Sequence, residues 1–230
     1  MNTIVRIRIK MCGVTRLQDA MVAAGAGVDA LGFIFYEKSP RYIDPEEARL
    51  IIEELPPFVD TVGVFVDKKR KEVEEIIRYC RLGYAQLHGE EGPKYCERLV
   101  RLAAPCQVLK AIRVGGHCKA EDIALYNEHV KGFLLDTFKK DKLGGTGDIF
   151  DWKLIKRFNL QKPFLLAGGL DNGNILEALE GVRPYGVDVN SGVETAPGVK
   201  DYDLIRNFIR TVRNFEREMS TGNNQRVGKA

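Results

Sequence analysis

The sequence predicts a single-domain (β/α)8 barrel, the TIM-barrel class of α/β protein. Eight short apolar runs alternate along the chain with longer, charged, amphipathic stretches, the pattern of strands that are each followed by a helix. A length of 230 residues suits one such domain, for which about 250 residues is typical. We expect residues 1–218 to form the barrel and the polar segment 219–230 to be disordered.

The expected strands and helices follow one another in order from the amino terminus. The strands are expected near Val5–Cys12, Ala30–Phe35, Thr61–Val66, Tyr84–His88, Val108–Ile112, Gly132–Asp136, Pro163–Ala167 and Gly186–Val189. Helical periodicity lies between them, for example at Pro45–Leu55, Lys69–Leu82, Glu121–His129 and Asp171–Leu179, and a last helix follows at Tyr202–Glu218. An open doubly wound sheet is the alternative, but the first strand-to-helix turn, Cys12-Gly13-Val14-Thr15, lacks the expected glycine fingerprint.

The charge composition argues against a nucleic-acid or membrane partner. Lys and Arg total 35 against 32 Asp and Glu, a formal net charge of +3. The densest basic run, Lys68–Lys71, precedes glutamates at helical spacing and has no interleaved aromatic residues, which indicates a solvated helix face. No run reaches the ~18 apolar residues of a membrane span.

The cysteines indicate a reducing compartment. There are five, an odd number with no C-x-x-C pair, and no secretory signal precedes them, so we expect reduced thiols and a cytoplasmic protein. No His, Cys or carboxylate spacing suits a metal, and we expect neither a metal nor a cofactor. The sequence leaves the oligomeric state open, a homodimer included.

In a barrel, function concentrates where the strands end and in the loops that follow them. The polar and glycine residues at those positions are Cys12, Arg41, Asp67, His88, Arg113, Asp136, Gly168, Gly169, Asn190, Ser191 and Gly192. His88 and Arg113 are ambiguous, because a structural histidine and a surface arginine are both common. We expect them, with Lys10 and Asp188, to line one site.

The seventh and eighth loops predict a phosphate site. Gly168-Gly169 ends the seventh strand, and Asn190-Ser191-Gly192 ends the eighth. Glycines let the backbone approach an anion, and a short helix beginning there would direct its N–H groups at it. The alternative is that these glycines only relieve crowding in turns.

Strand alternation places Cys12 inside the barrel. Lys10 and Cys12 share one face of the first strand, and Ile9 and Met11 share the other, which should face the helices. A cation on the same face would lower the pKa of the thiol toward thiolate, so we interpret Cys12 as a general base rather than a small buried hydrophobe. Asp188 is the expected partner of the buried Lys10.

Asp136 ends an apolar strand, where burial would raise the pKa of its carboxyl group and allow it to act as an acid. A helix cap or a structural salt bridge is the alternative. The glycine-rich segment Leu143–Gly147 follows and is either a mobile lid or a connector. Arg41 could bind a carboxylate through two hydrogen bonds.

These motifs together resemble the phosphoribosylanthranilate isomerase family. They are Lys10-Met11-Cys12-Gly13-Val14-Thr15, Gly32–Phe35 with Lys38–Tyr42, Gly63–Val66, Gln86–Glu90, Leu134–Thr137, Gly144–Gly147 with Asp151-Trp152, Ala167–Leu170, and Val187–Val189 with Ser191–Glu194. They occur in the family's order. Met11, Glu37 and Asn190 depart from the usual pattern; Asn190 stands where a serine is expected beside the phosphate.

The resemblance implies a cofactor-free Amadori rearrangement in tryptophan biosynthesis, with N-(5'-phosphoribosyl)anthranilate as the small-molecule substrate. It implies that Asp136 is the general acid and Cys12 the general base. It further implies that Arg41 holds the substrate carboxylate and that the seventh and eighth loops hold the phosphate. A related barrel isomerase of histidine biosynthesis should carry a carboxylate where this chain has Cys12. A non-catalytic barrel that binds a phosphorylated ligand would need neither Cys12 nor Asp136.

Overall fold

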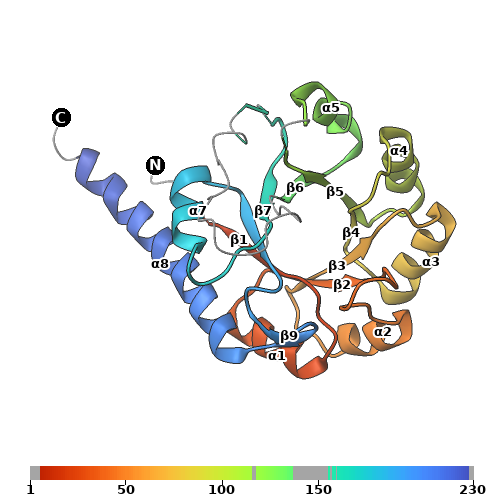
Figure 1. Ribbon diagram of the computed structural model, residues 1–230, viewed down its shortest axis with the longest axis horizontal. Helices are drawn as coiled ribbons and strands as arrows, with labels where there is room; N and C mark the ends of the chain where they lie inside the picture. The colour runs from red at the N-terminus through yellow and green to blue at the C-terminus, as the bar shows by residue number, and fades with distance from the viewer. Residues whose placement is uncertain (1–5, 116–117, 137–154, 156, 159, 228–230) are drawn as a thin grey trace.

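The computed structural model describes residues 6–115, 118–136, 155, 157–158 and 160–227, with side chains described up to residue 220. Eight parallel strands close into one barrel in sequence order (Figure 1). They are β1 (Arg8–Met11), β2 (Ala30–Ile34), β3 (Asp60–Phe65), β4 (Tyr84–Leu87), β5 (Gln107–Arg113), β6 (Gly132–Asp136), β7 (Phe164–Ala167) and β8 (Gly186–Val189). The predicted fold class is confirmed.

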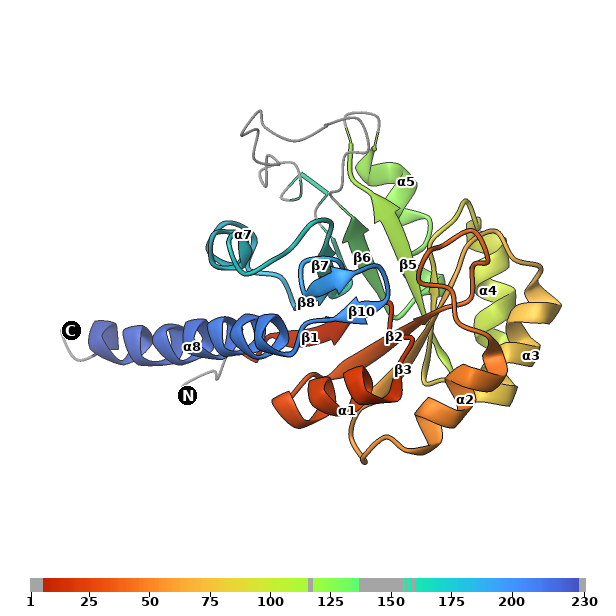
Figure 2. The ribbon, with the colours of Figure 1, turned by 60° about the horizontal axis from the view of Figure 1, so that its bottom comes forward.

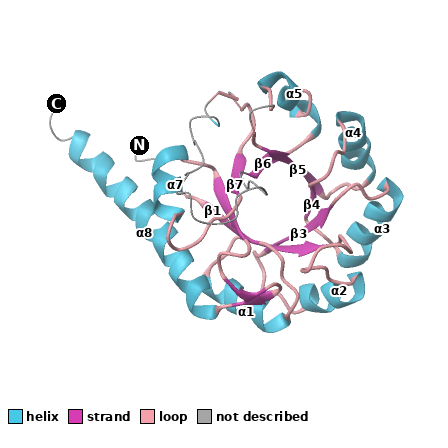
Figure 3. Cartoon of the chain, viewed as in Figure 1, coloured by secondary structure: helices cyan, strands magenta, loops and turns pink. Residues whose placement is uncertain are grey.

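Helices surround the barrel, as the ring of helices outside the strands in Figure 3 shows. They are α1 (Leu17–Ala26), α2 (Pro45–Glu53), α3 (Arg70–Cys80), α4 (Pro93–Leu102), α5 (Ala120–Ala124), the 3-10 helix η1 (Asn127–His129), α7 (Ile175–Val182) and α8 (Tyr202–Val227). The start of α2 illustrates the local signals: Asp44 accepts a hydrogen bond from the Glu46 N–H, and Pro45 occupies the first turn. Gly27, in the left-handed conformation, ends α1.

Alternation along the strands separates two kinds of core. The large core between barrel and helices contains Ile9 and Met11, as predicted from strand parity. Cys12 belongs instead to a small cluster with Ile34 and Val64 inside the barrel. The first strand therefore directs Cys12 toward the barrel interior.

Closure of the barrel joins β1 to β8. In the register of this pair, Lys10 lies opposite Asp188, and the predicted ion pair is present with Lys10 Nζ 2.8 Å from Asp188 Oδ1. Both side chains are buried. The contact links the first and last strands at the level just below Cys12.

Two elements differ from the prediction. The single helix expected over Glu121–His129 is divided into α5 and η1. α8 continues to Val227 and reaches beyond the barrel (Figures 1 and 2), whereas we expected residues 219–230 to be disordered. A helix that packing has already nucleated extends one hydrogen bond at a time, so a polar sequence can continue it. Among the described residues, no helix combines the length and the apolar character needed to cross a membrane.

Candidate active site

A cavity of about 290 Å³ lies at the carboxyl-terminal mouth of the barrel. Its lining consists of Cys12, Ile34, Arg41, Val64, Gln86, His88, Asp136, Ala167, Gly168, Gly169, Leu170, Asp188, Asn190 and Ser191. These residues come from seven of the eight strands, all except β5, or from the loops that follow those strands. The barrel thus brings most of the predicted site residues to one opening.

Cys12 is buried at the end of β1, and its N–H donates to the carbonyl of Val189 on β8. Burial raises the pKa of the Cys12 thiol; the charges of Lys10 and Lys200 lower it, and that of Asp188 raises it again. Lys10 lowers the thiol pKa as expected, but the net shift is upward, so the expectation of a net shift toward thiolate was wrong. The cation is present, but burial and Asp188 outweigh it.

The Lys10–Asp188 ion pair lies beneath the Cys12 thiol. Burial disfavours the ammonium ion, but Asp188 and Cys12 together more than offset it, and the pKa of Lys10 lies above its usual value. The neighbouring Cys12 thiol also raises the pKa of Lys10. Asp188 lines the cavity whereas Lys10 does not, so Lys10 reaches the site only through these two neighbours.

Asp136 and His88 are hydrogen-bonded across the cavity. His88 Nε2 lies 3.3 Å from Asp136 Oδ2, and Gln86 Nε2 lies 2.9 Å from His88 Nδ1. Because the Gln86 amide donates a hydrogen bond to Nδ1, a neutral His88 carries its proton on Nε2. The Nε2–H group then donates a hydrogen bond to Asp136. Asp136 and His88 remain partly accessible, with side-chain exposures of 20% and 23%.

Arg41 has a protein partner that the sequence analysis missed. Its Nε lies 3.0 Å from both carboxylate oxygens of Glu194, and its Nη2 lies 2.6 Å from Oε2. Glu194 also accepts from the buried Lys200, whose Nζ lies 2.8 Å away. Burial opposes the charge on Glu194, but the hydrogen bonds from Arg41 and Lys200 lower its pKa below the usual value.

Nothing in the sequence pattern identified Lys200. Glu194 ends the motif Ser191–Glu194, but its residue type and spacing did not indicate a role. Both residues belong to a hairpin, β9 (Glu194–Ala196) and β10 (Val199–Lys200), that precedes α8.

The two glycine-bearing loops lie at the same mouth. Gly168 and Gly169 both have positive φ, 97° and 72°, a conformation that favours glycine. After β8, however, the chain enters a turn and the β9–β10 hairpin, so the helix expected to begin at Asn190–Gly192 is absent there. The turn forms because Val193 and Glu194 donate to the carbonyls of Asn190 and Ser191.

Three predicted lining residues lie outside the cavity wall. Gly192 packs against the seventh loop, where an ideal Cβ would lie 2.0 Å from the Leu170 carbonyl oxygen. Arg113 is exposed at the end of β5, paired in register with Asp136, and Lys10 is buried as described. The glycine-rich segment Leu143–Gly147 lies outside the described residues. Within the described residues, no group of three or more His, Cys, Asp or Glu side chains is placed to hold a metal ion.

Comparison with known proteins agrees with this geometry. The family model for N-(5'phosphoribosyl)anthranilate (PRA) isomerase matches residues 9–211. An N-(5'-phosphoribosyl)anthranilate isomerase of Trichlorobacter lovleyi is 47% identical over 208 residues, which are 90% of this chain and 98% of that protein. Among solved structures, the phosphoribosyl anthranilate isomerase of Thermotoga maritima is 41% identical, with a TM-score of 0.79 over 91% of this chain and 100% of that one.

A second solved phosphoribosyl anthranilate isomerase contains reduced 1-(o-carboxyphenylamino)-1-deoxyribulose 5-phosphate. It is 40% identical, with a TM-score of 0.76, over 91% of this chain and 100% of its own. The family match over residues 9–211 includes every residue that lines the cavity. This chain belongs to the N-(5'-phosphoribosyl)anthranilate isomerase family.

Proposed function

We propose that this family member isomerises N-(5'-phosphoribosyl)anthranilate to 1-(2-carboxyphenylamino)-1-deoxyribulose 5-phosphate, with Cys12 as general base and Asp136 as general acid. The observation that carries the assignment is that both side chains line the same cavity of about 290 Å³. A thiol and a carboxyl group on one small cavity can reach opposite ends of a single sugar ring.

The rearrangement needs one acid and one base. Asp136 gives a proton to the ring oxygen as the C1'–O bond breaks, and the nitrogen lone pair forms the C1'=N bond of a protonated Schiff base. Cys12 then removes the C2' proton, and the released electron pair forms the C1'=C2' bond of an enolamine while nitrogen becomes neutral. Tautomerisation gives the 2'-ketone, so the sequence is redox-neutral overall and uses no external oxidant.

The remaining lining groups match the two charged ends of the substrate. Arg41 binds the anthranilate carboxylate, and backbone N–H groups of Gly168 and Gly169, with Asn190 and Ser191, hold the phosphate. Glycines at these two positions, without a Cβ, let the backbone approach an anion closely. Gly192, half-buried against the seventh loop, contributes turn geometry rather than a contact.

The test is turnover of freshly prepared N-(5'-phosphoribosyl)anthranilate, followed by the loss of its fluorescence. Cys12→Ala and Asp136→Asn should each lower kcat by ~10²-fold or more, while Cys118→Ala, which removes a half-buried thiol away from the cavity, should leave kcat unchanged. Near-normal turnover by Cys12→Ala would overturn its role. Tight substrate binding without turnover by the wild type would indicate a non-catalytic binder.

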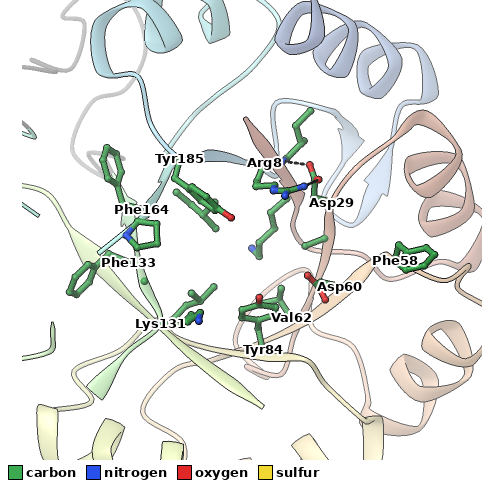
Figure 4. Close-up of a pocket in the computed structure, with 17 residues that line it drawn as sticks. Arg8, Asp29, Phe58, Asp60, Val62, Tyr84, Lys131, Phe133, Phe164 and Tyr185 are labelled. Carbon is green, nitrogen blue, oxygen red and sulfur yellow. Dashed lines mark hydrogen bonds and ion pairs between the residues drawn. The ribbon is translucent and has the colours of Figure 1, made fainter. Parts of the chain in front are cut away.

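We further propose a homodimer that pairs through the amino-terminal mouth of the barrel. A second cavity, of about 350 Å³, opens there between residues that include Arg8, Asp60, Tyr84, Phe133, Phe164 and Tyr185 (Figure 4). Phe58 lies at its rim, fully exposed at 102% and with a φ of 71°. A bulky residue in that conformation is strained, and an apolar projection beside a hollow is self-complementary under two-fold symmetry. A similar isomerase from Thermotoga maritima, 38% identical, is described as dimeric.

Light scattering coupled to size-exclusion chromatography tests this pairing. Phe58→Gln should shift a dimer toward monomer, whereas Leu50→Gln, at another exposed apolar side chain on α2, should not. A wild-type monomer at all accessible concentrations would refute the pairing.

A cytoplasmic location is the third part of the proposal. All five cysteines are free thiols, four of them buried, as suits a reducing compartment. Fractionation of cells that express the tagged protein tests it, and recovery in an extracytoplasmic fraction would contradict it.

A further inference from the structure

Glu194 holds the guanidinium of Arg41 by one edge. The hydrogen bonds from Nε and Nη2 use that edge, and Glu194 is nearly fully buried, with 4% of its side chain exposed. Within the described part of the chain, Nη1 has no hydrogen-bond partner, and Arg41 lines the cavity. The outer end of the guanidinium, formed by Nη1 and Nη2, therefore remains for a ligand carboxylate.

Lys200 occupies the other side of Glu194. Its side chain has no exposed surface, and its Nζ lies 2.6 Å from the Cys12 carbonyl oxygen, 3.1 Å from the Asn190 carbonyl oxygen and 3.0 Å from Asn190 Oδ1. One ammonium group thus ties the end of β1, the loop after β8 and the β9–β10 hairpin together.

The charges of Arg41, Glu194 and Lys200 do not cancel. Burial lowers the pKa of Lys200, and the contact with Glu194 opposes that shift. With Lys200 protonated, two cations face the single anion Glu194, which leaves one positive charge beside the cavity. Without Lys200, Glu194 would neutralise Arg41, and a ligand carboxylate would meet no net charge. With Lys200 in place, Arg41 is held rigidly and still attracts an anion.

Gly13 leaves the space that this arrangement requires. An ideal Cβ at Gly13, whose φ is 73°, would lie 2.6 Å from Asn190 Oδ1 and 2.8 Å from Arg41 Cδ. The residue that follows Cys12 therefore lets Arg41 and Asn190 approach the end of β1.

We propose that Glu194 and Lys200 are positioning residues for substrate selection: Glu194 orients Arg41 so that its outer end meets the substrate carboxylate, and Lys200 preserves the net positive charge. The inference rests on the proposed role of Arg41 and adds the pair that makes Arg41 selective. Neither residue touches substrate in this arrangement; Arg41 separates Glu194 from it.

The test compares two substrates, N-(5'-phosphoribosyl)anthranilate and its analogue made from aniline and ribose 5-phosphate, which lacks the carboxylate. Selectivity is the ratio of their kcat/KM values. Glu194→Gln should lower this ratio ~10-fold or more, mainly through a higher KM for the anthranilate substrate. Glu194→Asp, which keeps the charge but withdraws it by one methylene, should lower the ratio less and serves if the glutamine variant does not fold.

Arg41→Ala separates this inference from the proposed function. If Arg41→Ala leaves the ratio unchanged, the assignment of Arg41 as the carboxylate-binding residue fails. If Arg41→Ala lowers the ratio but Glu194→Gln and Glu194→Asp do not, the assignment stands and the positioning role of Glu194 is wrong. In the Arg41→Ala background, Glu194→Gln should cause no further loss of selectivity, whereas a purely structural role would lower both kcat/KM values equally in either background.

Discussion

Gly32 leaves the space that the thiol of Cys12 occupies. An ideal Cβ built on Gly32 would lie 2.9 Å from Cys12 Sγ and 3.1 Å from Lys10 Nζ. β2 therefore has no side chain at the point where the Cys12 thiol, at the end of β1, lies against it. The geometry of the base depends on a neighbouring strand as well as on Cys12 itself.

Gly32→Ala should lower activity more than stability. The added methyl group must displace the thiol or the Lys10 ammonium, and a displacement of about 1 Å at a reacting group can cost ~10²-fold in rate. Steady-state kcat/KM and thermal unfolding together measure both effects. Gly25→Ala, where an added Cβ meets nothing within 4 Å, should retain full activity. Equal activity in the two variants would show that the packing of Gly32 against Cys12 is irrelevant to catalysis.

The activity should rise with pH above neutrality. Because burial raises the pKa of the Cys12 thiol, only a small fraction is thiolate at neutral pH, and a base that needs the thiolate gains ~10-fold per pH unit until the thiol titrates. The measurement is kcat/KM against pH. The thiolate absorbance of the wild type minus that of Cys12→Ser should titrate over the same range. A flat kcat/KM from pH ~6 to ~9 would exclude the thiolate as the base.

Removing His88 should reduce the rate while leaving substrate affinity nearly unchanged. His88 donates to Asp136 and is itself fixed by Gln86, so His88→Ala removes one of the hydrogen bonds that orient the carboxyl group. We expect kcat to fall ~10-fold or more with little change in KM. His129→Ala, in η1 outside the cavity, is the matched control. An unaltered kcat in His88→Ala would mean that the hydrogen bond has no part in presenting the acid.

Local patterns in the sequence were sufficient for the barrel and for the direction of Cys12. Alternation along one strand places Lys10 and Cys12 together, and this information lies within three consecutive residues. The pairings of His88 with Asp136 and of Arg41 with Glu194 join residues 48 and 153 positions apart. The closed barrel determines which side chains meet over such separations. Hydrophobic periodicity in the sequence does not predict these pairs.

The direction of the thiol pKa shift could not be predicted for a related reason. The sequence places a cation beside Cys12, but the sign of the net shift depends on how completely water is removed and on how close Asp188 lies. Both quantities follow from barrel closure. The length of α8 is a different case, because the polar sequence of its last turns has no hydrophobic periodicity from which the end of the helix could be predicted.

Asp29 should stabilise the fold in a pH-dependent manner. Its carboxylate accepts hydrogen bonds from Arg6, Arg8, Arg213 and the Ile9 N–H at 2.8–3.2 Å, which joins α8 to the start of the barrel. Burial works against the charge, but these hydrogen bonds lower the pKa of Asp29 below its usual value. A lowered carboxyl pKa contributes stability above the unfolded-state pKa, and this contribution is lost as the pH falls through the folded-state value.

Asp29→Asn should therefore cost about 2 kcal/mol in the free energy of unfolding at pH ~7, since three arginines lose their anion but two of them remain well exposed to water. Urea unfolding from pH ~7 to ~3 should show the gap between the two proteins closing at the acid end. Asp203→Asn, which removes an exposed carboxylate paired with Arg206, should change the free energy by less than ~0.5 kcal/mol throughout. A gap between wild type and Asp29→Asn that stays constant down to pH ~3 would show that packing, rather than the charge of Asp29, stabilises this end of the barrel.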